Sequence, residues 1–150
     1  MTEALKLEVK EAEVSEYHND PAVLFVLTAQ SADSFLAFTR KNMNKTMLFR
    51  VDGRDMIKPP RIVQEIPGGR GVLSTSNMDE AIALAERLNS GNADFEVEAT
   101  REWRISVIST QTVYLGRVEA TDEESAIKAA IAELGINKAH QLRLIAQPVE

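Results

Sequence analysis

The stretch TMLFRVDGRDMIKPPRIVQEIPGGRG, residues 46–71, decides the fold because it holds a strand, a hairpin and a glycine-rich turn in succession. Met47, Phe49 and Val51 fall at every second position, which predicts a strand over 46–51. Asp52-Gly53 follows at once and predicts a type I′ hairpin, whose two central residues need positive φ. The sequence therefore indicates an antiparallel pair, typical of a sheet built from hairpins.

The chain after the hairpin has weaker strand signals. Residues 54–57 are expected to return along the first strand, and 61–66 form a second, less regular candidate strand. Pro59 and Pro60 between them have no N–H to donate, which places this segment at a sheet edge or outside the sheet. The segment Pro67–Gly71 is then expected to turn the chain into one more strand.

The residues before this stretch predict two strands and a helix. Alternating apolar positions predict a strand over 5–14, and the unbroken apolar run within 22–28 predicts a buried strand. Apolar residues at helical spacing predict an amphipathic helix over 32–43, with Ser31 as its N-cap.

The residues after it predict a second helix and a separate second half. Asn77 with Glu80 resembles a capping box and predicts a helix that ends near Gly91. We expect a domain boundary there, with one domain over 1–92 and a small second domain over 93–150. The second domain is expected to contain strands near 94–99, 102–109 and 112–120, a helix from Thr121 to Gly135, and a final strand over 141–146.

These elements predict an α+β fold, in which helices pack on one face of an antiparallel sheet in a ferredoxin-like style of βαβ arrangement. The chain has 150 residues, of which 44% are hydrophobic and 27% charged, as in ordinary globular domains. A net charge of −6 with interspersed signs argues against nucleic-acid partners and polybasic membrane contacts. The longest apolar run, 22–27, is too short to span a bilayer, and the absence of cysteine excludes disulfides and thiolate chemistry.

Several residues invite a chemical interpretation, and in each case a structural one is favoured. Gly68–Gly71 resembles a phosphate loop, but strand-like residues follow it where a helix N-terminus is needed. Asp52 and Asp55 are candidates for an acid/base pair, although the first already serves the turn. The acids that begin the third helix suit its dipole better than a metal (Glu119, Asp122, Glu123 and Glu124). His18 and His140 lack a second histidine at ligand spacing. Because each candidate has a structural explanation, we expect no catalytic residue, metal or cofactor.

The order of parts resembles the SecD family, in particular the head subdomain of its first periplasmic domain. The resemblance covers about residues 22–91 and rests on a helix ending in Phe38-Thr39, a strand ending in Asp52-Gly53, a return with Pro59, the turn Ile66-Pro67-Gly68-Gly69, and a helix with Glu80, Ala81, Leu84, Ala85, Leu88, Ser90 and Gly91. The resemblance implies that the chain is an accessory of the Sec translocon and not an enzyme. It also implies a location on the periplasmic side of the membrane. Residues 93–150 resemble small bacterial domains of unknown role.

The resemblance implies a non-enzymatic binding module for extended polypeptide or for Sec translocon components. The proline-broken edge over 54–66 is a candidate site for adding a peptide strand, with Arg54, Lys58, Arg61, Ile62, Val63 and Arg70 as its residues. Two alternatives remain open at this point. The edge is also suited to a structural protein that forms homodimers, and the Gly68–Gly71 loop to a small-ligand protein or enzyme.

Overall fold

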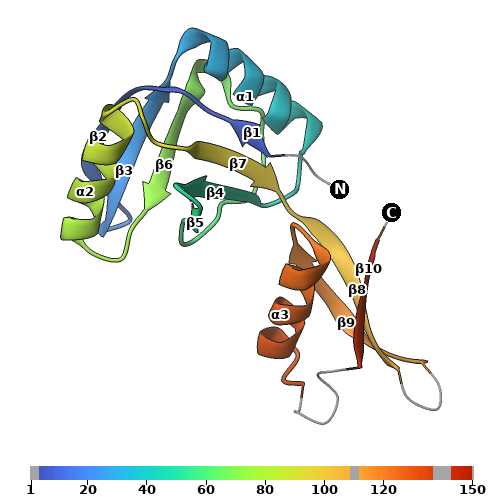
Figure 1. The fold of residues 1–150 in the computed structure, drawn as a ribbon. Helices are drawn as coiled ribbons and strands as arrows, with labels where there is room; N and C mark the ends of the chain where they lie inside the picture. Colours follow the sequence, from blue (N-terminus) through green and yellow to red (C-terminus); the bar gives the residue numbers. More distant parts are fainter. Residues whose placement is uncertain (1–3, 109–111, 137–142, 150) are drawn as a thin grey trace. The chain divides into compact units, whose positions relative to one another are not determined.

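The computed structural model describes residues 4–108, 112–136 and 143–149 (Figure 1). The chain divides after Ala99 into two compact units, called here the N-terminal unit and the C-terminal unit. Both mix antiparallel sheets with helices, which confirms the α+β class. The sequence interpretation places strand 94–99 in the second domain. In the structure this strand pairs with two strands of the N-terminal unit, so that unit extends past residue 92.

Two sheets and two helices make up the N-terminal unit. Its elements are β1 (Leu5–Lys6), β2 (Val9–Tyr17), β3 (Asp20–Leu27), α1 (Ala29–Lys41), β4 (Met47–Val51), β5 (Arg54–Asp55), the 3-10 turn η1 (Pro67–Gly69), β6 (Arg70–Ser74), α2 (Met78–Asn89) and β7 (Phe95–Ala99). One sheet has the order β1-β7-β4-β5 and the other the order β2-β3-β6.

The strand expected over 5–14 is divided between these two sheets. β1 pairs with β7, whereas β2 pairs with β3. Between them Leu7 is buried in the core, and its N–H donates to the Phe95 carbonyl at 2.8 Å. Period-two alternation reports which side chains are buried, but it does not report which partner the backbone pairs with. The prediction of one continuous strand was therefore wrong.

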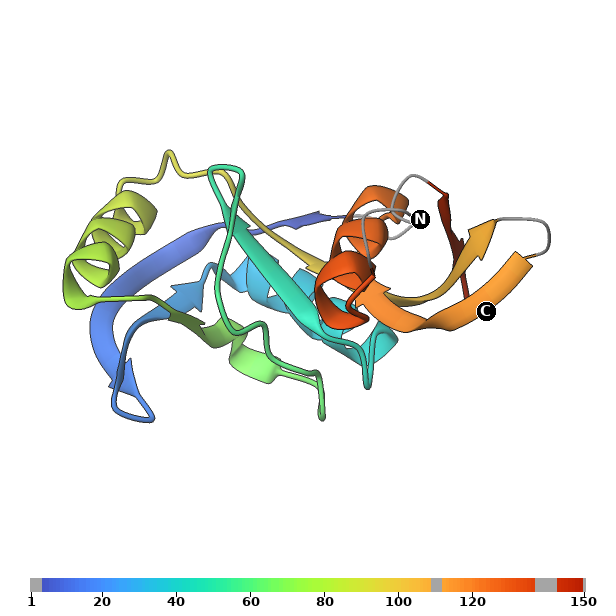
Figure 2. The same ribbon diagram turned by 90° about the horizontal axis from the view of Figure 1, so that it is seen from below.

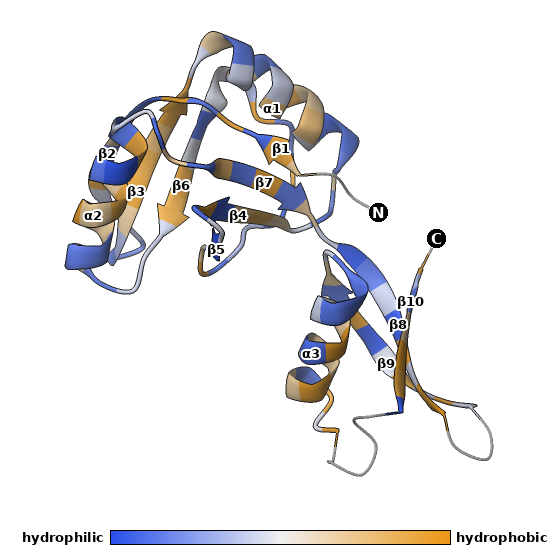
Figure 3. Ribbon diagram, in the orientation of Figure 1, coloured by the Kyte–Doolittle hydropathy of each residue, from blue (hydrophilic) through white to orange (hydrophobic). Residues whose placement is uncertain are grey.

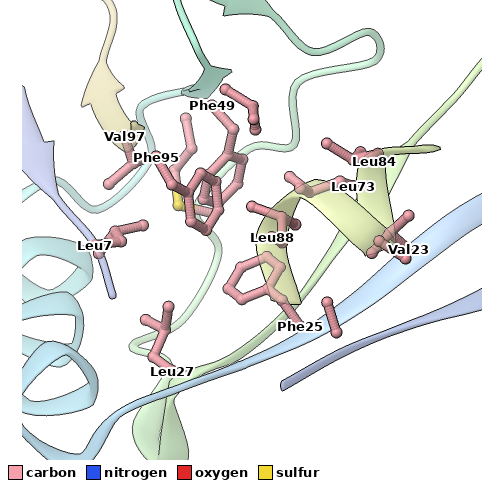
Figure 4. Close-up of a cluster of buried hydrophobic side chains, with 14 of the residues drawn as sticks. Leu7, Val23, Phe25, Leu27, Phe49, Leu73, Leu84, Leu88, Phe95 and Val97 are labelled. Atoms are coloured by element: carbon pink, nitrogen blue, oxygen red, sulfur yellow. The ribbon is translucent and has the colours of Figure 1, made fainter. Parts of the chain in front are cut away.

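Phenylalanine rings fill the core between the two sheets. Phe25 of β3 lies 5.2 Å from the ring of Phe95 and 5.7 Å from that of Phe49, both in edge-to-face geometry. Phe35 of α1 lies 6.2 Å from Phe49. Figure 4 shows Phe25, Phe49 and Phe95 converging from separate strands. Because aromatic pairs in such geometries add to ordinary apolar burial, this cluster joins the two sheets.

The helices lie close to the expected ranges, but α1 begins at Ala29, three residues before the expected start, and its cap differs. Thr28, not Ser31, caps α1, since its side chain accepts from the Ser31 N–H at 3.3 Å. The Ser31 hydroxyl instead accepts from the Glu8 N–H at 2.8 Å. Asn77 caps α2 as predicted, accepting from the Glu80 N–H at 2.8 Å.

The return after the hairpin is shorter than predicted. Asp52 has φ 51° and Gly53 has φ 82°, which confirms the hairpin turn. β5 then contains only two residues, and the strand expected over 61–66 is reduced to a single bridge between Arg61 and Thr46. Figure 2 follows this return from β4 to η1 (teal to light green). With Pro59 and Pro60 unable to donate, a regular ladder cannot form here.

The described residues of the C-terminal unit form a three-stranded sheet with one helix. Its elements are β8 (Arg101–Ile108), β9 (Thr112–Ala120), α3 (Glu123–Glu133) and β10 (Leu144–Pro148), and its sheet has the order β10-β8-β9. Asp122 caps α3 by accepting from the Ser125 N–H at 2.7 Å. Trp103 packs in this core and donates its indole N–H to the Ala120 carbonyl at 2.9 Å. His140 and the first residues of the predicted final strand lie outside the described residues.

Candidate functional site

The residues that recur in the family resemblance are engaged inside the N-terminal unit. The Thr39 hydroxyl of α1 donates to the Leu36 carbonyl at 3.0 Å and accepts from the Ile66 N–H, also at 3.0 Å. Gly69 in η1 is buried, and a Cβ added there lies 2.7 Å from the Ala32 Cβ. The glycine turn is therefore a docking point for α1, and not a free loop that cradles a ligand.

Asp52, the first residue of the hairpin turn, also forms a network of hydrogen bonds with α2 and with the residue before β7. Its carboxylate accepts from Arg87 of α2, with Asp52 Oδ2 to Arg87 Nε at 2.7 Å and Asp52 Oδ1 to Arg87 Nη2 at 3.2 Å. The Asp94 N–H donates to the same carboxylate at 3.0 Å. Hydrogen bonding to the Arg87 guanidinium holds the pKa of Asp52 below its ordinary value, and the Asp94 N–H lowers it further. This network joins the hairpin to α2 and to the start of β7.

The network around Asp52 is expected to stabilise the fold more at neutral pH than at low pH. Because the pKa of Asp52 is lowered on folding, its stabilising effect is present above the unfolded value, about 3.9, and is lost as pH falls through the folded value. Asp52→Asn keeps a residue that tolerates positive φ but removes the charge. We expect it to lower the melting temperature at pH 7, with the difference from the parent chain shrinking toward pH 2 in thermal melts.

Asp33→Asn is the matched control for this prediction. Asp33 is exposed on α1 and makes no ion pair with a described residue, so its substitution is expected to leave both melting curves unchanged. A difference between Asp52→Asn and the parent chain that persists unchanged at pH 2 would contradict the electrostatic account.

The two aspartates of the hairpin do not form an acid/base pair. Asp55 is bonded to Arg50 at 2.8 Å, whereas Asp52 is bonded to Arg87. Among residues 4–108, 112–136 and 143–149, no three histidine, aspartate or glutamate side chains are placed to hold a metal ion. Within those same ranges no helix is long and apolar enough to cross a membrane.

Ile62 and Val63 are neighbours with opposite environments. Ile62 is 1% exposed and belongs to the core. Its N–H donates to the Lys45 carbonyl and its carbonyl accepts from the Asn44 N–H, both at 2.8 Å. Val63 is 73% exposed. The main chain of Ile62 is thus already used within the fold, and Val63 presents its side chain to solvent.

The four predicted cations have different surroundings. Arg54 is exposed on β5, and Lys58 pairs with Asp20 at 2.7 Å. The Arg61 guanidinium donates to the Asn44 carbonyl. Arg70 is exposed at the start of β6 and makes no ion pair with a described residue. Arg70 lies beside a hollow lined by residues of β2, β3 and β6.

That hollow lies on the face of the β2-β3-β6 sheet turned away from the core. Register places Glu11 opposite Val26 and Val26 opposite Arg70, and in the next row Glu13 opposite Leu24 and Leu24 opposite Val72. We call these six residues the outer face. They line a cavity of about 490 Å³ together with Ala12, Phe25 and Gly71.

The outer face was not predicted from the sequence, although a signal for it was present. Residues 22–27 are apolar at every position, so β3 is apolar on both faces, as its colour in Figure 3 shows. The core takes up one face, where Phe25 belongs to the same buried cluster as Phe35 of α1 and Leu88 of α2. The residues of β3 on the other face, Leu24 and Val26, are only half-buried.

Comparison with known proteins identifies relatives of this chain. The family model described as "SecDF, P1 head subdomain" matches residues 3–93. The protein translocase subunit SecD of Leptotrichia buccalis is 35% identical over 79 residues, which are 52% of this chain and 19% of that protein. SecD of Sebaldella termitidis is 38% identical over 72 residues, 47% of this chain and 18% of that protein.

A third relative extends the similarity beyond the N-terminal unit. SecD of Thermobaculum terrenum is 29% identical over 117 residues, 77% of this chain and 21% of that protein. This length exceeds the N-terminal unit, which ends at Ala99, so the match enters the C-terminal unit. The chain spans about a fifth of the length of the curated relatives it matches. No solved structure matches it significantly.

Proposed function

The chain belongs to the SecDF P1 head subdomain family, and from this membership we propose that it is a non-enzymatic binding module of Sec-dependent protein export. Its ligand in this proposal is an exported polypeptide or a component of the Sec translocon. The proposal places the module on the periplasmic side, as the resemblance to SecD implies.

One observation carries the proposal. The family match, residues 3–93, coincides with nearly all of a unit that has its own core and divides from the rest after Ala99. The matched stretch therefore supplies most of a packed body, which β7 (Phe95–Ala99) completes. Thr39, Gly69 and Asp52, which carry the resemblance, form internal contacts, and the proposal therefore places binding on exposed side chains.

The return segment 54–63 is the proposed contact surface. Val63 and Ile57 are 73% and 41% exposed, and Val63 is the most exposed of the large apolar side chains among the described residues. Arg54, Lys58 and Arg61 surround them in sequence. Because the main chain of Ile62 is bonded within the fold, we propose contact through side chains here and not addition of a peptide strand.

Fluorescence anisotropy with a permanently unfolded polypeptide tests this function. The probe is reduced, carboxymethylated α-lactalbumin labelled with fluorescein, titrated with the full chain. We expect saturable binding that Val63→Asp weakens several-fold, because a charge replaces an exposed apolar contact. Ile82→Asp is the control, since Ile82 is an exposed apolar residue on α2, outside the return segment, with 44% exposure against the 73% of Val63.

Two results would contradict the proposal. Absence of binding to the unfolded probe and to purified translocon would remove the binding function. Concentration-dependent dimerisation that Val63→Asp abolishes, without any binding of the probe, would instead assign the segment to homodimer assembly. Sedimentation velocity of both chains distinguishes these cases.

A further inference from the structure

The outer face of the β2-β3-β6 sheet combines an apolar strip with two glutamates that have no ion-pair partner among the described residues. Leu24, Val26 and Val72 form the half-buried strip. Glu11 and Glu13 border it along β2, both exposed, and neither makes an ion pair with a described residue. Two like charges on one face, two positions apart, repel each other unless a cation lies between them.

The adjoining edge of the sheet is less suited to a ligand than this face. The Asn89 side chain of α2 accepts from the Ala12 N–H and donates to the Ala12 carbonyl, both at 2.8 Å. It thereby occupies the middle of the outer edge of β2, where an added strand would need those groups. A polypeptide that approaches β2 is left with the face, whose hollow of about 490 Å³ is open.

We propose that the outer face binds an extended polypeptide segment that carries lysine or arginine beside apolar side chains. Alternate side chains of an extended chain are about 6.6–6.8 Å apart, the same spacing that separates Glu11 from Glu13 on β2. Cations two positions apart on the ligand therefore match both carboxylates while apolar groups cover Leu24 and Val26. Arg70 at the other side of the strip disfavours a basic residue there and fixes which side of the ligand is cationic.

This inference rests on the proposed function and adds a charge preference and a second contact surface to it. The probes are two fluorescein-labelled peptides with leucines in a serine and glycine background, one with interspersed lysines and one with glutamates. We expect the full chain to bind the lysine peptide more tightly. Glu11→Gln/Glu13→Gln is expected to weaken that binding roughly three- to tenfold at low salt. Charge screening at high salt is expected to remove the difference.

A control variant and a reversal variant make the test specific. Glu16→Gln/Glu86→Gln removes the same charge away from the outer face and is expected to change nothing. Glu11→Lys/Glu13→Lys is expected to reverse the preference toward the glutamate peptide, which a merely structural role for these residues would not do. Because all four positions are exposed, none of the variants should fail to fold.

The outcomes separate this inference from the proposed function. Equal binding of the two peptides, or unchanged binding in the Glu11/Glu13 variants, overturns the inference while leaving any Val63-dependent binding of unfolded protein intact. Self-association that disappears in Glu11→Gln/Glu13→Gln overturns it too, because the occupant is then a second copy of the chain. Failure of every polypeptide to bind removes the proposed function and this inference together.

Discussion

Phe25→Ala is expected to lower the free energy of unfolding of the N-terminal unit by about 3–5 kcal/mol, a large part of the usual 5–15 kcal/mol of a domain. Phe25 is 1% exposed and contacts the rings of both Phe49 and Phe95, which come from the other sheet. Its removal leaves a cavity where the two sheets meet. Urea titration followed by far-UV circular dichroism measures the effect, since the single tryptophan, Trp103, lies in the C-terminal unit.

Phe38→Ala is the matched control for this substitution. Phe38 is stacked on Phe35 at 6.3 Å but only partly buried, so its truncation is expected to cost roughly half as much or less. Equal effects at the two positions would mean that the aromatic cluster does not join the sheets as described.

Gly69→Ala is expected to destabilise the chain by roughly 2–4 kcal/mol. The backbone at Gly69 has φ 63°, and an added Cβ lies 2.7 Å from the Ala32 Cβ and 3.0 Å from the Leu27 Cβ. Neither neighbour is the flexible end of a side chain, so α1 and η1 must separate. The same urea titration provides the measurement.

Gly68→Ala measures the conformational cost alone, so its difference from Gly69→Ala gives the packing cost. Gly68 has φ 81°, and a Cβ there meets nothing within 4 Å, so only the conformational cost of about 1–2 kcal/mol remains. If the two glycine variants are equally destabilised, η1 does not dock on α1 through Gly69. If Gly69→Ala instead weakens binding of unfolded protein without loss of stability, the turn is itself a ligand loop.

Local signals in the sequence were sufficient for most elements of the fold. The Asn77 cap, the Asp52-Gly53 hairpin and the amphipathic helices depend on neighbouring residues only, and all are found in the structure. The pairing of β1 and β2 with different sheets depends on Phe95, some 90 positions away, which no local pattern specifies. The α1 cap was misplaced by three residues because Ser31 and Thr28 are both competent caps.

The candidate site was predicted less accurately than the fold, because its residues were chosen for lying close together in the sequence. Ile62 and Val63 are adjacent in the chain, yet one is core and the other solvent-exposed. Arg70 was grouped with the cations around the double proline, whereas register places it across β3 from Glu11. Strand register brings together residues some 60 positions apart, and a single sequence does not reveal that register.

The residues that carry the resemblance and the residues proposed to bind polypeptide have different structural roles. Thr39, Gly69 and Asp52, which carry the resemblance, hold α1, η1 and the hairpin in place. Val63 and the outer face are not among the residues that carry the resemblance, and they are displayed to solvent or only half-buried. The contacts that build the scaffold are thus separate from the surfaces proposed to bind polypeptide.

The central claim is that the chain contacts polypeptides of the export route, and in-cell photocrosslinking tests it most directly. A photoreactive amino acid replaces Val63 in the full chain as the cell makes it, and adducts are identified by mass spectrometry, with the same probe at Ile82 as the control. The account predicts adducts to exported polypeptides or Sec translocon subunits from Val63 and few from Ile82. Adducts only to a second copy of the chain, or to proteins outside the export route, would contradict it.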